Sequence, residues 1–334
     1  MEQRDLTKIL RAALEAFVVG DALGAPVEYM PREEIIKRLG FIDSIVDPQK
    51  TYIHQDLPKA SITDDTSQLM AIWQQYVMDH KVTLEGTVKA LLRWYREAPL
   101  HIKKRIGPTS AKALERLAAG ESPEVTGVTG ITCGGAMRVP AVAVCTPRGE
   151  YVQLAENVYV SLLPTHNTNI ALEAATALAF AIHAAMEGME RDKVIAKAFS
   201  GAAVGRKRGA TLVGASTLAR LEVIMTVLPT LNTPERLMYY LYNVIGTEMT
   251  ANQVVPVVFG LSFWAWQNPW QAIKMGASLG GDTDTIAALA GFLATLLNAG
   301  NHLIPPDIVD YVLTVNNINI QRLVESTVDL FWKV

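Results

Sequence analysis

The feature that most constrains the fold is the recurrence of apolar residues at steps of three and four along most of the chain. Two clear examples are Leu6, Ile9, Leu10, Ala13 and Phe17, and then Leu69, Ile72, Trp73, Tyr76 and Val77. This spacing places the apolar side chains on one face of an α-helix. The strict apolar–polar alternation that predicts a half-buried strand is nearly absent. The sequence therefore predicts an all-α fold.

Capping residues predict where several helices begin and end. Thr168 precedes an alanine-rich stretch that runs to Gly188, and Thr233 is followed by proline at the first helical position. An apolar stripe that ends just before Gly300 is typical of a helix C-terminus. Residues 139–144 are a short apolar run that is also compatible with a strand. Irregular structure is predicted near residues 40–62, 100–110, 121–138 and 145–168.

The composition is that of a folded protein with a sizeable core. Of the 334 residues, 50% are hydrophobic and 19% are charged, which excludes a disordered chain. No internal repeat or linker-like stretch divides the sequence, so we expect residues 1–334 to form a single domain. The net charge of −3 argues against nucleic-acid binding, which usually requires a basic face.

Cysteine content and hydropathy favour a cytoplasmic location. Only two cysteines occur, with no CxxC motif, so no disulfide framework is expected, which suits a reducing compartment. The mixed charges of the first five residues are not those of a signal peptide. The longest mainly apolar stretches, residues 254–266 and 286–297, are shorter than the ~20 residues that a bilayer span needs. We therefore expect no membrane association.

Two acidic segments stand directly before amphipathic helices. They are Thr63-Asp64-Asp65-Thr66 and Gly280-Gly281-Asp282-Thr283-Asp284-Thr285. One acidic residue at a helix start is most simply a cap, which typically stabilises a helix by ~0.3–1 kcal/mol. A cap needs only one acceptor, however, whereas each segment supplies two carboxylates and flanking threonine hydroxyls. This surplus of oxygen atoms favours a binding role.

Helix geometry limits how the second segment can act. Residues two apart point to different sides of a regular helix, so Asp282 and Asp284 converge only if Asp282 lies in the turn before the helix. Gly280 and Gly281 permit the unusual backbone that such a turn requires. If the two acidic segments meet in the fold, four carboxylates share one pocket, and two divalent cations would cancel their charge. Oxygen ligands without histidine or cysteine pairs favour Mg²⁺ or Mn²⁺.

The sequence resembles the ADP-ribosylglycohydrolase family. The motifs that carry the resemblance are, in chain order, Gly20-Asp21-Ala22-Leu23-Gly24-Ala25-Pro26-Val27-Glu28, Thr63-Asp64-Asp65-Thr66, Gly134-Gly135-Ala136-Met137-Arg138, Thr165-His166 and Gly280-Gly281-Asp282-Thr283-Asp284-Thr285. The resemblance implies a single compact multi-helix domain with a binuclear Mg²⁺ or Mn²⁺ centre in a central cleft.

The resemblance also implies roles for individual residues. One cation would be held by Thr63, Asp64, Asp65 and Asp284, and the other by Asp282, Asp284 and Thr285. Glu28 matches a glutamate on a loop that covers the second cation in relatives, which makes it a candidate for catalysis and for substrate binding. Asp64 and Asp65 are joint candidates for the general base that takes a proton from a cation-activated water.

A further group of residues is implied to line the substrate: Glu28, Thr132, Cys133, Gly134, Gly135 and His166. His166 matches a family position near the substrate, but a histidine directly before a helix is equally often a structural residue. Relatives usually carry Gly-Asn-Gly where this chain has Thr132-Cys133-Gly134. Cysteine lacks the hydrogen-bonding groups of asparagine, so the lining is expected to differ. Arg138 is expected to pair with an internal carboxylate.

The reaction that the resemblance implies is hydrolysis of an ADP-ribosyl glycosidic linkage. The acceptor would be arginine nitrogen, a hydroxyl oxygen or a small molecule, so the partner would be an ADP-ribosylated protein or a free ADP-ribose derivative. Two alternatives stay open: a hydrolase of another ribosylated small molecule or nucleoside, and a catalytically silent member of the kind recruited as crystallins. The intact aspartates of both acidic segments argue against a purely structural role.

Overall fold

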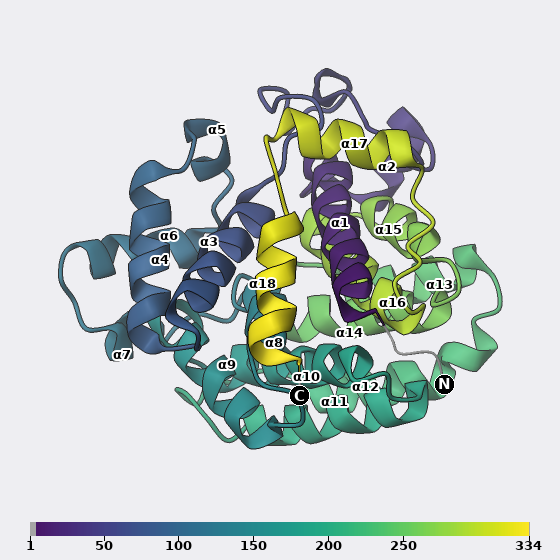
Figure 1. The fold of residues 1–334 in the computed structure, drawn as a ribbon. Coiled ribbons are helices and arrows are strands. Elements are labelled where there is room, and N and C mark those ends of the chain that lie inside the picture. The colour runs from purple at the N-terminus through teal and green to yellow at the C-terminus, as the bar shows by residue number, and fades with distance from the viewer. Residues whose placement is uncertain (1–4, 334) are drawn as a thin grey trace. The chain divides into compact units, whose positions relative to one another are not determined.

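The computed structural model describes residues 5–333, which form helices joined by turns and loops (Figure 1). Within this range there is no strand; the β-type contacts are two isolated bridges, one between Thr132 and Thr250 and one between Thr168 and Ala210. The prediction of an all-α fold is confirmed. Residues 139–144, which were also compatible with a strand, form the short helix α8 (Val139–Val144).

The described residues group into two compact units. Unit 1 contains the residues up to Ile62, Val227–Glu248 and the residues from Val257 onward, and unit 2 contains Thr63–Thr226 and Met249–Pro256. Two helices cross a unit boundary along the chain, namely α12 (Thr217–Val227) and α14 (Ala251–Trp264). The organisation of residues 1–334 as a single domain stays a prediction.

Unit 1 is built around a long N-terminal helix. Besides part of α14, its elements are α1 (Leu6–Gly24), η1 (Ala25–Val27), α2 (Arg32–Leu39), η2 (Pro48–Lys50), η4 (Leu228–Thr230), α13 (Pro234–Tyr240), the π-helical turn η5 (Leu241–Ile245), α15 (Pro269–Ala277), α16 (Thr283–Leu297), α17 (Pro306–Val315) and α18 (Gln321–Phe331). Thr233 caps α13 as predicted. Of the predicted apolar face of α1, Ile9, Leu10, Ala13 and Phe17 are buried, and Leu6 is half-buried.

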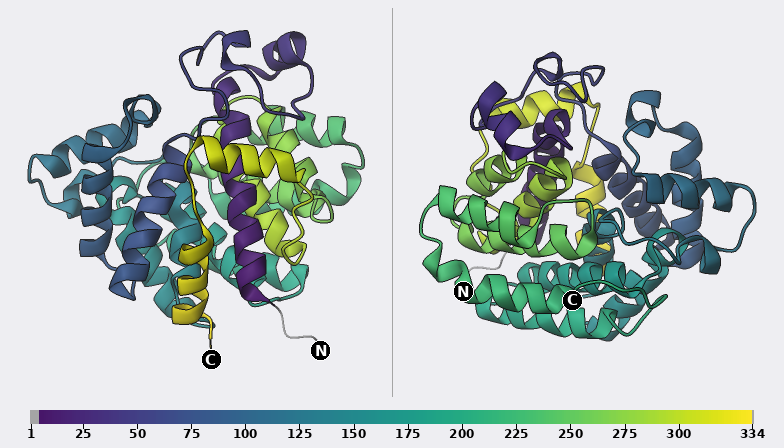
Figure 2. Two further views of the ribbon diagram at one scale, coloured as in Figure 1. Left: turned by 45° about the horizontal axis from the view of Figure 1, so that its top comes forward. Right: turned by 180° about the vertical axis from the view of Figure 1, so that it is seen from behind.

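Helices α1 and α16 lie side by side, and α15 packs against both (Figure 1). In the two views of Figure 2 the purple helix again runs beside the yellow-green helices. Two glycines of α1 make the approach close. A Cβ on Gly20 would lie 2.6 Å from the backbone carbonyl carbon of Ala287, and one on Gly24 would lie 2.4 Å from the Thr283 oxygen. The backbone of α1 therefore touches the first turns of α16, which fixes the segment after α1 near the start of α16.

Unit 2 has a fully buried helix at its centre. Its elements are α3 (Asp64–Asp79), α4 (Leu84–Glu97), α5 (Leu100–Lys103), α6 (Pro108–Ala118), α7 (Pro123–Thr126), η3 (Ala136–Arg138), α8, α9 (Tyr151–His166), α10 (Asn169–Met186), α11 (Arg191–Gly205) and most of α12. Helix α10 begins after Thr168, whose side chain accepts the Ala171 N–H as predicted. It packs against α8, α9 and α11.

By length and hydropathy alone, α10 is the one described helix that could cross a membrane, but all 18 of its residues are buried inside the protein. It is therefore the core of unit 2. The prediction of irregular structure over residues 145–168 is wrong for α9. Its buried face carries Leu154, Val158 and Leu162 at four-residue steps, but Pro164 suggests a helix end. The proline lies in the last turn, where it removes only one hydrogen bond.

Candidate active site

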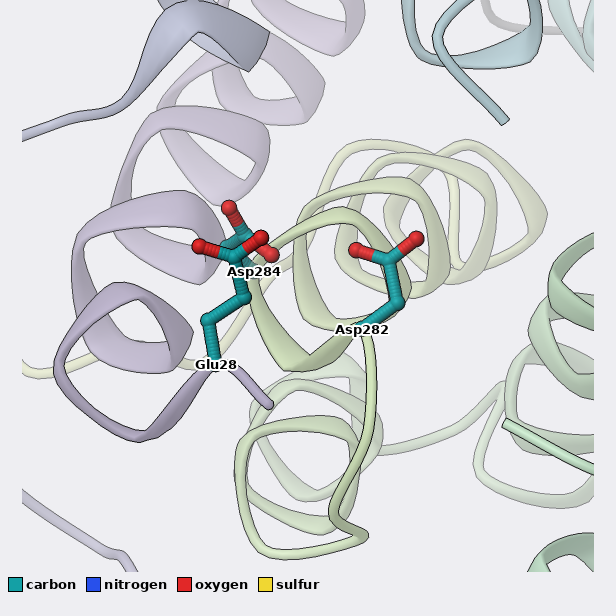
Figure 3. A group of neighbouring side chains, drawn as sticks. All are labelled: Glu28, Asp282 and Asp284. Carbon is teal, nitrogen blue, oxygen red and sulfur yellow. The ribbon is translucent and has the colours of Figure 1, made fainter. Parts of the chain in front are cut away.

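Three buried carboxylates gather in unit 1, and we call Glu28, Asp282 and Asp284 the acidic cluster (Figure 3). Glu28 directly follows η1, Asp282 is the N-cap residue of α16, and Asp284 lies in its first turn. One carboxylate oxygen of each residue lies within 4.8 Å of the other two, and each residue is at most 4% exposed. Asp282 thus lies before the helix and Asp284 within it, as the two-residue spacing requires.

Two glycines shape the turn that carries Asp282. Gly280 and Gly281 have φ angles of +85° and +82°, a region that favours glycine. A Cβ on Gly281 would lie only 2.1 Å from the Thr247 carbonyl oxygen. Asp282 N–H donates to that carbonyl at 2.9 Å, and Tyr29 N–H donates to the Gly281 carbonyl at 2.8 Å. These backbone bonds hold Asp282 beside the segment that follows α1.

Tyr29 and His54 adjoin the acidic cluster. His54 Nε2 lies 3.2 Å from Glu28 Oε2, and both side chains are buried. The centroids of the Tyr29 and His54 rings are 6.0 Å apart. Partial burial, then the Glu28 charge and a hydrogen bond to it, raise the pKa of Tyr29 well above its usual range. Tyr29 therefore stays protonated and donates its hydroxyl hydrogen to Glu28.

The acidic cluster has the chemistry of a site for a hard divalent cation. Neighbouring carboxylates repel one another, and a bound cation cancels that repulsion. Oxygens on opposite sides of one Mg²⁺ are about 4.2 Å apart, because each bond is about 2.1 Å long; the oxygens of the cluster lie within 4.8 Å. An all-oxygen donor set favours Mg²⁺ or Mn²⁺ over Zn²⁺. Thr285, buried next to Asp284, carries a further hydroxyl.

The second acidic helix start lies in unit 2. Thr63 is the N-cap residue of α3, and its hydroxyl oxygen accepts the Asp65 N–H at 3.1 Å. Asp64 and Asp65 occupy the first turn and are 6% and 3% exposed. Because Thr63 provides the cap, capping does not account for the two buried carboxylates. Two buried carboxylates and a threonine hydroxyl supply the oxygen ligands that a hard cation prefers.

A continuous chain of hydrogen bonds leads away from Asp64, and we call it the Arg138 relay. Its members are, in order, Asp64, Gln68, Arg138, Thr165, His166 and Thr132. Gln68 donates to Asp64 Oδ2 at 2.8 Å. Arg138 donates to Gln68 Oε1 at 3.0 Å and to Thr165 Oγ1 at 2.6 Å. His166 Nδ1 lies 2.9 Å from Thr165 Oγ1, and His166 Nε2 lies 2.9 Å from Thr132 Oγ1.

The relay contains one buried, charged guanidinium, that of Arg138, and one neutral imidazole, that of His166. Five of its members are buried, while Thr132 is half-buried. Burial lowers the pKa of Arg138 to about 10, although Asp64 and Asp65 act in the opposite direction; the guanidinium is therefore charged at neutral pH. Burial, followed by the charge of Arg138, lowers the pKa of His166 well below its usual range. His166 is consequently neutral.

The loop of residues 130–135 lies directly on His166. A Cβ on Gly134 would lie 2.9 Å from His166 Cε1, and one on Gly135 would lie 3.1 Å from His166 Cβ. Both glycines are therefore needed for close packing against His166, and Gly135 also for close packing against Leu162. The Cys133 side chain is buried, and its N–H donates to the Met249 carbonyl at 2.7 Å. Thr132 is the member of this loop whose hydroxyl contacts His166.

Each unit thus brings together part of the predicted site. Unit 1 gathers Glu28, Asp282 and Asp284, and unit 2 gathers Thr63, Asp64 and Asp65 at one end of the relay and Thr132 and His166 at the other. The prediction that the two acidic segments share one pocket stays a prediction. Arg138 does not meet the expectation of a direct carboxylate partner, because Gln68 and Thr165 receive its hydrogen bonds.

Sequence reasoning missed Gln68, Tyr29 and His54. A signal for Gln68 was present, since it follows Asp64 by four positions, a spacing that places side chains in contact on a helix. Tyr29 directly follows Glu28, but nothing in the sequence indicates the direction of its hydroxyl. His54 belongs to a predicted irregular segment without periodicity, so no sequence pattern points to its position beside Glu28.

The matches to known proteins extend over the sequences of both units. The family model described as ADP-ribosylglycohydrolase matches residues 2–333. A solved structure described as an ADP-ribosylglycohydrolase-related protein complex has a TM-score of 0.68 with 21% identity, and the alignment covers 99% of each chain. The chain therefore has the fold of that structure.

Similar sequences occur among curated proteins of bacteria and archaea. The protein YegU of Escherichia coli (strain K12) is 28% identical over 318 residues, which is 95% of each chain. A protein of Archaeoglobus fulgidus is 27% identical over 297 residues, covering 84% of this chain and 85% of its own. The ADP-ribosylarginine hydrolase Tri1 of Pseudomonas putida (strain GB-1) is 25% identical over 327 residues, covering 96% of this chain and 77% of its own.

Proposed function

Because the chain belongs to the ADP-ribosylglycohydrolase family, we propose that it is a cation-dependent hydrolase of an ADP-ribosyl glycosidic linkage. Family membership supports the hydrolysis of ADP-ribosyl linkages in general. The scissile bond in this proposal joins ADP-ribose to an arginine nitrogen, to a hydroxyl oxygen or to a small acceptor molecule. The observation that carries the proposal is the acidic cluster, where the Asp282 side chain lies at the helix start without capping it.

We propose that the cofactors are two Mg²⁺ or Mn²⁺ ions. The proposed ligands are the oxygen-bearing residues of the two helix starts: Thr63, Asp64, Asp65, Asp282, Asp284 and Thr285. The position of Glu28 in the acidic cluster supports a part for it in holding a cation as well as in binding substrate. When bound, the cations would orient the ribose hydroxyls and make water a nucleophile near neutral pH.

The side chains of the protein would carry the proton and stabilise the developing charge. Asp64 and Asp65 are the proposed general base and accept a proton from the attacking water. The side-chain amide of Gln68 donates a hydrogen bond to one oxygen of Asp64, and this bond fixes the direction of the carboxylate. Departure of the acceptor leaves positive charge on the anomeric carbon, and neighbouring carboxylates stabilise it.

The proposed partner is an ADP-ribosylated protein or a small ADP-ribose derivative, and the proposed location is the cytoplasm. Arg138 and His166 are buried behind Thr132, which supports a polar lining for the ligand in the loop of residues 130–135. Both cysteines are buried free thiols, which is compatible with a reducing compartment.

The test is a substrate panel assayed in the presence of Mg²⁺, Mn²⁺ or a chelator. The panel contains peptides ADP-ribosylated on arginine, serine or cysteine, free ADP-ribose derivatives and ribonucleosides. We expect release of ADP-ribose that the chelator abolishes and that either cation restores. Turnover of ribonucleosides alone would instead identify a different ribosyl hydrolase, and a complete lack of turnover would identify a catalytically silent member.

A further inference from the structure

Arg138 reaches in two directions from a fully buried position. One arm of its guanidinium donates to Gln68, which in turn donates to Asp64. The other arm donates to Thr165, next to His166. We propose that Arg138 is a positioning residue that fixes the proton of His166 on Nε2 and thereby makes the Thr132 hydroxyl a hydrogen-bond donor to the substrate.

The direction of the hydrogen bonds follows from what each group can do. Arginine carries only donors, so the oxygen of Gln68 must face Arg138 and its amide nitrogen must face Asp64. By the same reasoning Thr165 Oγ1 accepts from Arg138. The Thr165 hydroxyl hydrogen is then left to donate, and His166 Nδ1 lies 2.9 Å away.

The tautomer of His166 is the consequence. A neutral imidazole has one N–H and one acceptor nitrogen. Because Nδ1 accepts from Thr165, the hydrogen resides on Nε2, and Nε2 donates to Thr132 Oγ1 at 2.9 Å. Both ring nitrogens are thereby satisfied inside the protein, which a buried polar group requires.

The last member of the relay has a hydrogen to donate. Since Thr132 Oγ1 accepts from His166, its own hydroxyl hydrogen is available, and Thr132 is only half-buried. A donor at this position selects a ligand with an oxygen acceptor. Resting on the proposed function, the inference is that Thr132 donates to an oxygen of the ADP-ribosyl group. Thr132 would thereby supply a hydrogen bond to the ligand at a loop where Cys133 lacks the hydrogen-bonding groups of asparagine.

The tautomer can be tested without any ligand or cation. Nitrogen-15 NMR of the protein labelled at histidine separates protonated from unprotonated ring nitrogens, and loss of signals in His166→Gln identifies the His166 pair. We expect a protonated Nε2 and an Nδ1 that accepts a hydrogen bond. Thr165→Val should shift the Nδ1 signal towards that of a nitrogen without a hydrogen bond, whereas Thr165→Ser, which keeps the hydroxyl, should not. Protonation of His166 on Nδ1 in the wild-type protein would overturn the proposed role of Arg138.

Binding of ADP-ribose at saturating Mn²⁺ tests the role of Thr132. The isosteric Thr132→Val should raise the dissociation constant about fivefold to tenfold, as expected for one lost hydrogen bond, and Thr132→Ser should leave it within about twofold. Thr165→Val should weaken binding when Thr132 is present and have little further effect in the Thr132→Val background, because the two act in series. Equal affinities of wild type and Thr132→Val would overturn the assignment.

The two experiments separate the inference from the proposed function. A wild-type protein that binds no ADP-ribose while His166 carries its proton on Nε2 would contradict the proposed function and support the relay. Protonation of His166 on Nδ1 would contradict the relay whatever the ligand is. Circular dichroism of each variant confirms that the helical fold is retained, and the Thr165→Ser and Thr132→Ser variants control for packing.

Discussion

Gly281 lies so close to Thr247 that no side chain fits between them: a Cβ would be 2.1 Å from the Thr247 carbonyl oxygen. The same carbonyl accepts the N–H of Asp282. The position of Asp282 in the acidic cluster is therefore set by backbone contacts of its neighbours, and not only by its own side chain. The turn is as much a part of the candidate site as the carboxylates are.

Substitution of Gly281 should destabilise unit 1 more than substitution of another glycine with a positive φ that lies in open space. Gly40 is the matched control, since its φ is +74° and a Cβ there would meet nothing within 4 Å. Gly40→Ala should lower the free energy of unfolding by about 1–3 kcal/mol through backbone strain alone. Gly281→Ala should lose a further ~1–3 kcal/mol through the clash. Equal losses in urea denaturation would contradict this account of the turn.

Loss of the Asp284 carboxylate should weaken the binding of both proposed cations. Calorimetry on the purified protein should show about two Mg²⁺ or Mn²⁺ ions per chain, as for a binuclear centre. In Asp284→Ala, affinity should fall by at least about tenfold at both sites, because charge count sets the affinity of oxygen-ligand sites. Asp307→Ala is the control, since Asp307 is an exposed acidic residue in the first turn of α17. Unchanged binding of both ions to Asp284→Ala would rule out a bridging role.

Removal of the Asp65 charge should abolish most of the catalytic activity while the fold survives. Asp65→Asn keeps the size of the side chain but removes its basicity, so turnover should fall by roughly 10²–10⁴-fold if Asp65 acts as general base. Asp79→Asn, at the other end of α3, is the control and should retain activity. A rate within twofold of wild type, with an unchanged helical spectrum, would leave Asp64 as the base.

Features that depend on residues close together along the chain could be predicted from the sequence. Helix starts at Thr63, Thr168 and Thr233 were predictable because a cap involves residues two or three positions apart. Helix α9 was missed although Leu154, Val158 and Leu162 recur at four-residue steps on its buried face. The acidic residues themselves stood out by spacing.

Contacts between segments that lie far apart along the chain could not be predicted from local sequence patterns. The approach of Glu28 to Asp282 depends on the packing of α1 against α16. The position of His54 depends on a segment that has no apolar repeat. The Arg138 relay joins residues nearly a hundred positions apart, such as Gln68 and Thr165, which no local pattern connects.

Acid should destabilise the protein through two of its buried histidines, His166 and His183. Burial lowers the pKa of His166 and His183 below their ordinary value, so the unfolded chain binds more protons than the folded one as the pH falls below about 6.5. Their contribution to stability is complete above about pH 6.5 and is lost as the pH falls towards the folded-state pKa values. Between about pH 7.5 and 5.5, each histidine should lower the free energy of unfolding by up to about 1.4 kcal/mol.

Urea unfolding at the two pH values measures this loss. The His166→Gln variant should show a smaller dependence on pH than the wild type, by the contribution of one histidine, even if it is less stable at both values. A pH dependence identical to that of wild type would mean that His166 binds a proton equally in the folded and unfolded states.

The Arg138 relay also restricts how this sequence can drift. Gln68, Arg138, Thr165 and His166 each bond to a member from another part of the chain. A change at one of these positions therefore leaves a polar group buried without its partner, at a cost of about 1–3 kcal/mol. A homologue that replaces Gln68 or Thr165 is therefore expected to have replaced Arg138 or His166 as well. In an alignment of the family, residues at the start of α3 should therefore covary with residues at the end of α9, because Arg138 bonds to both segments.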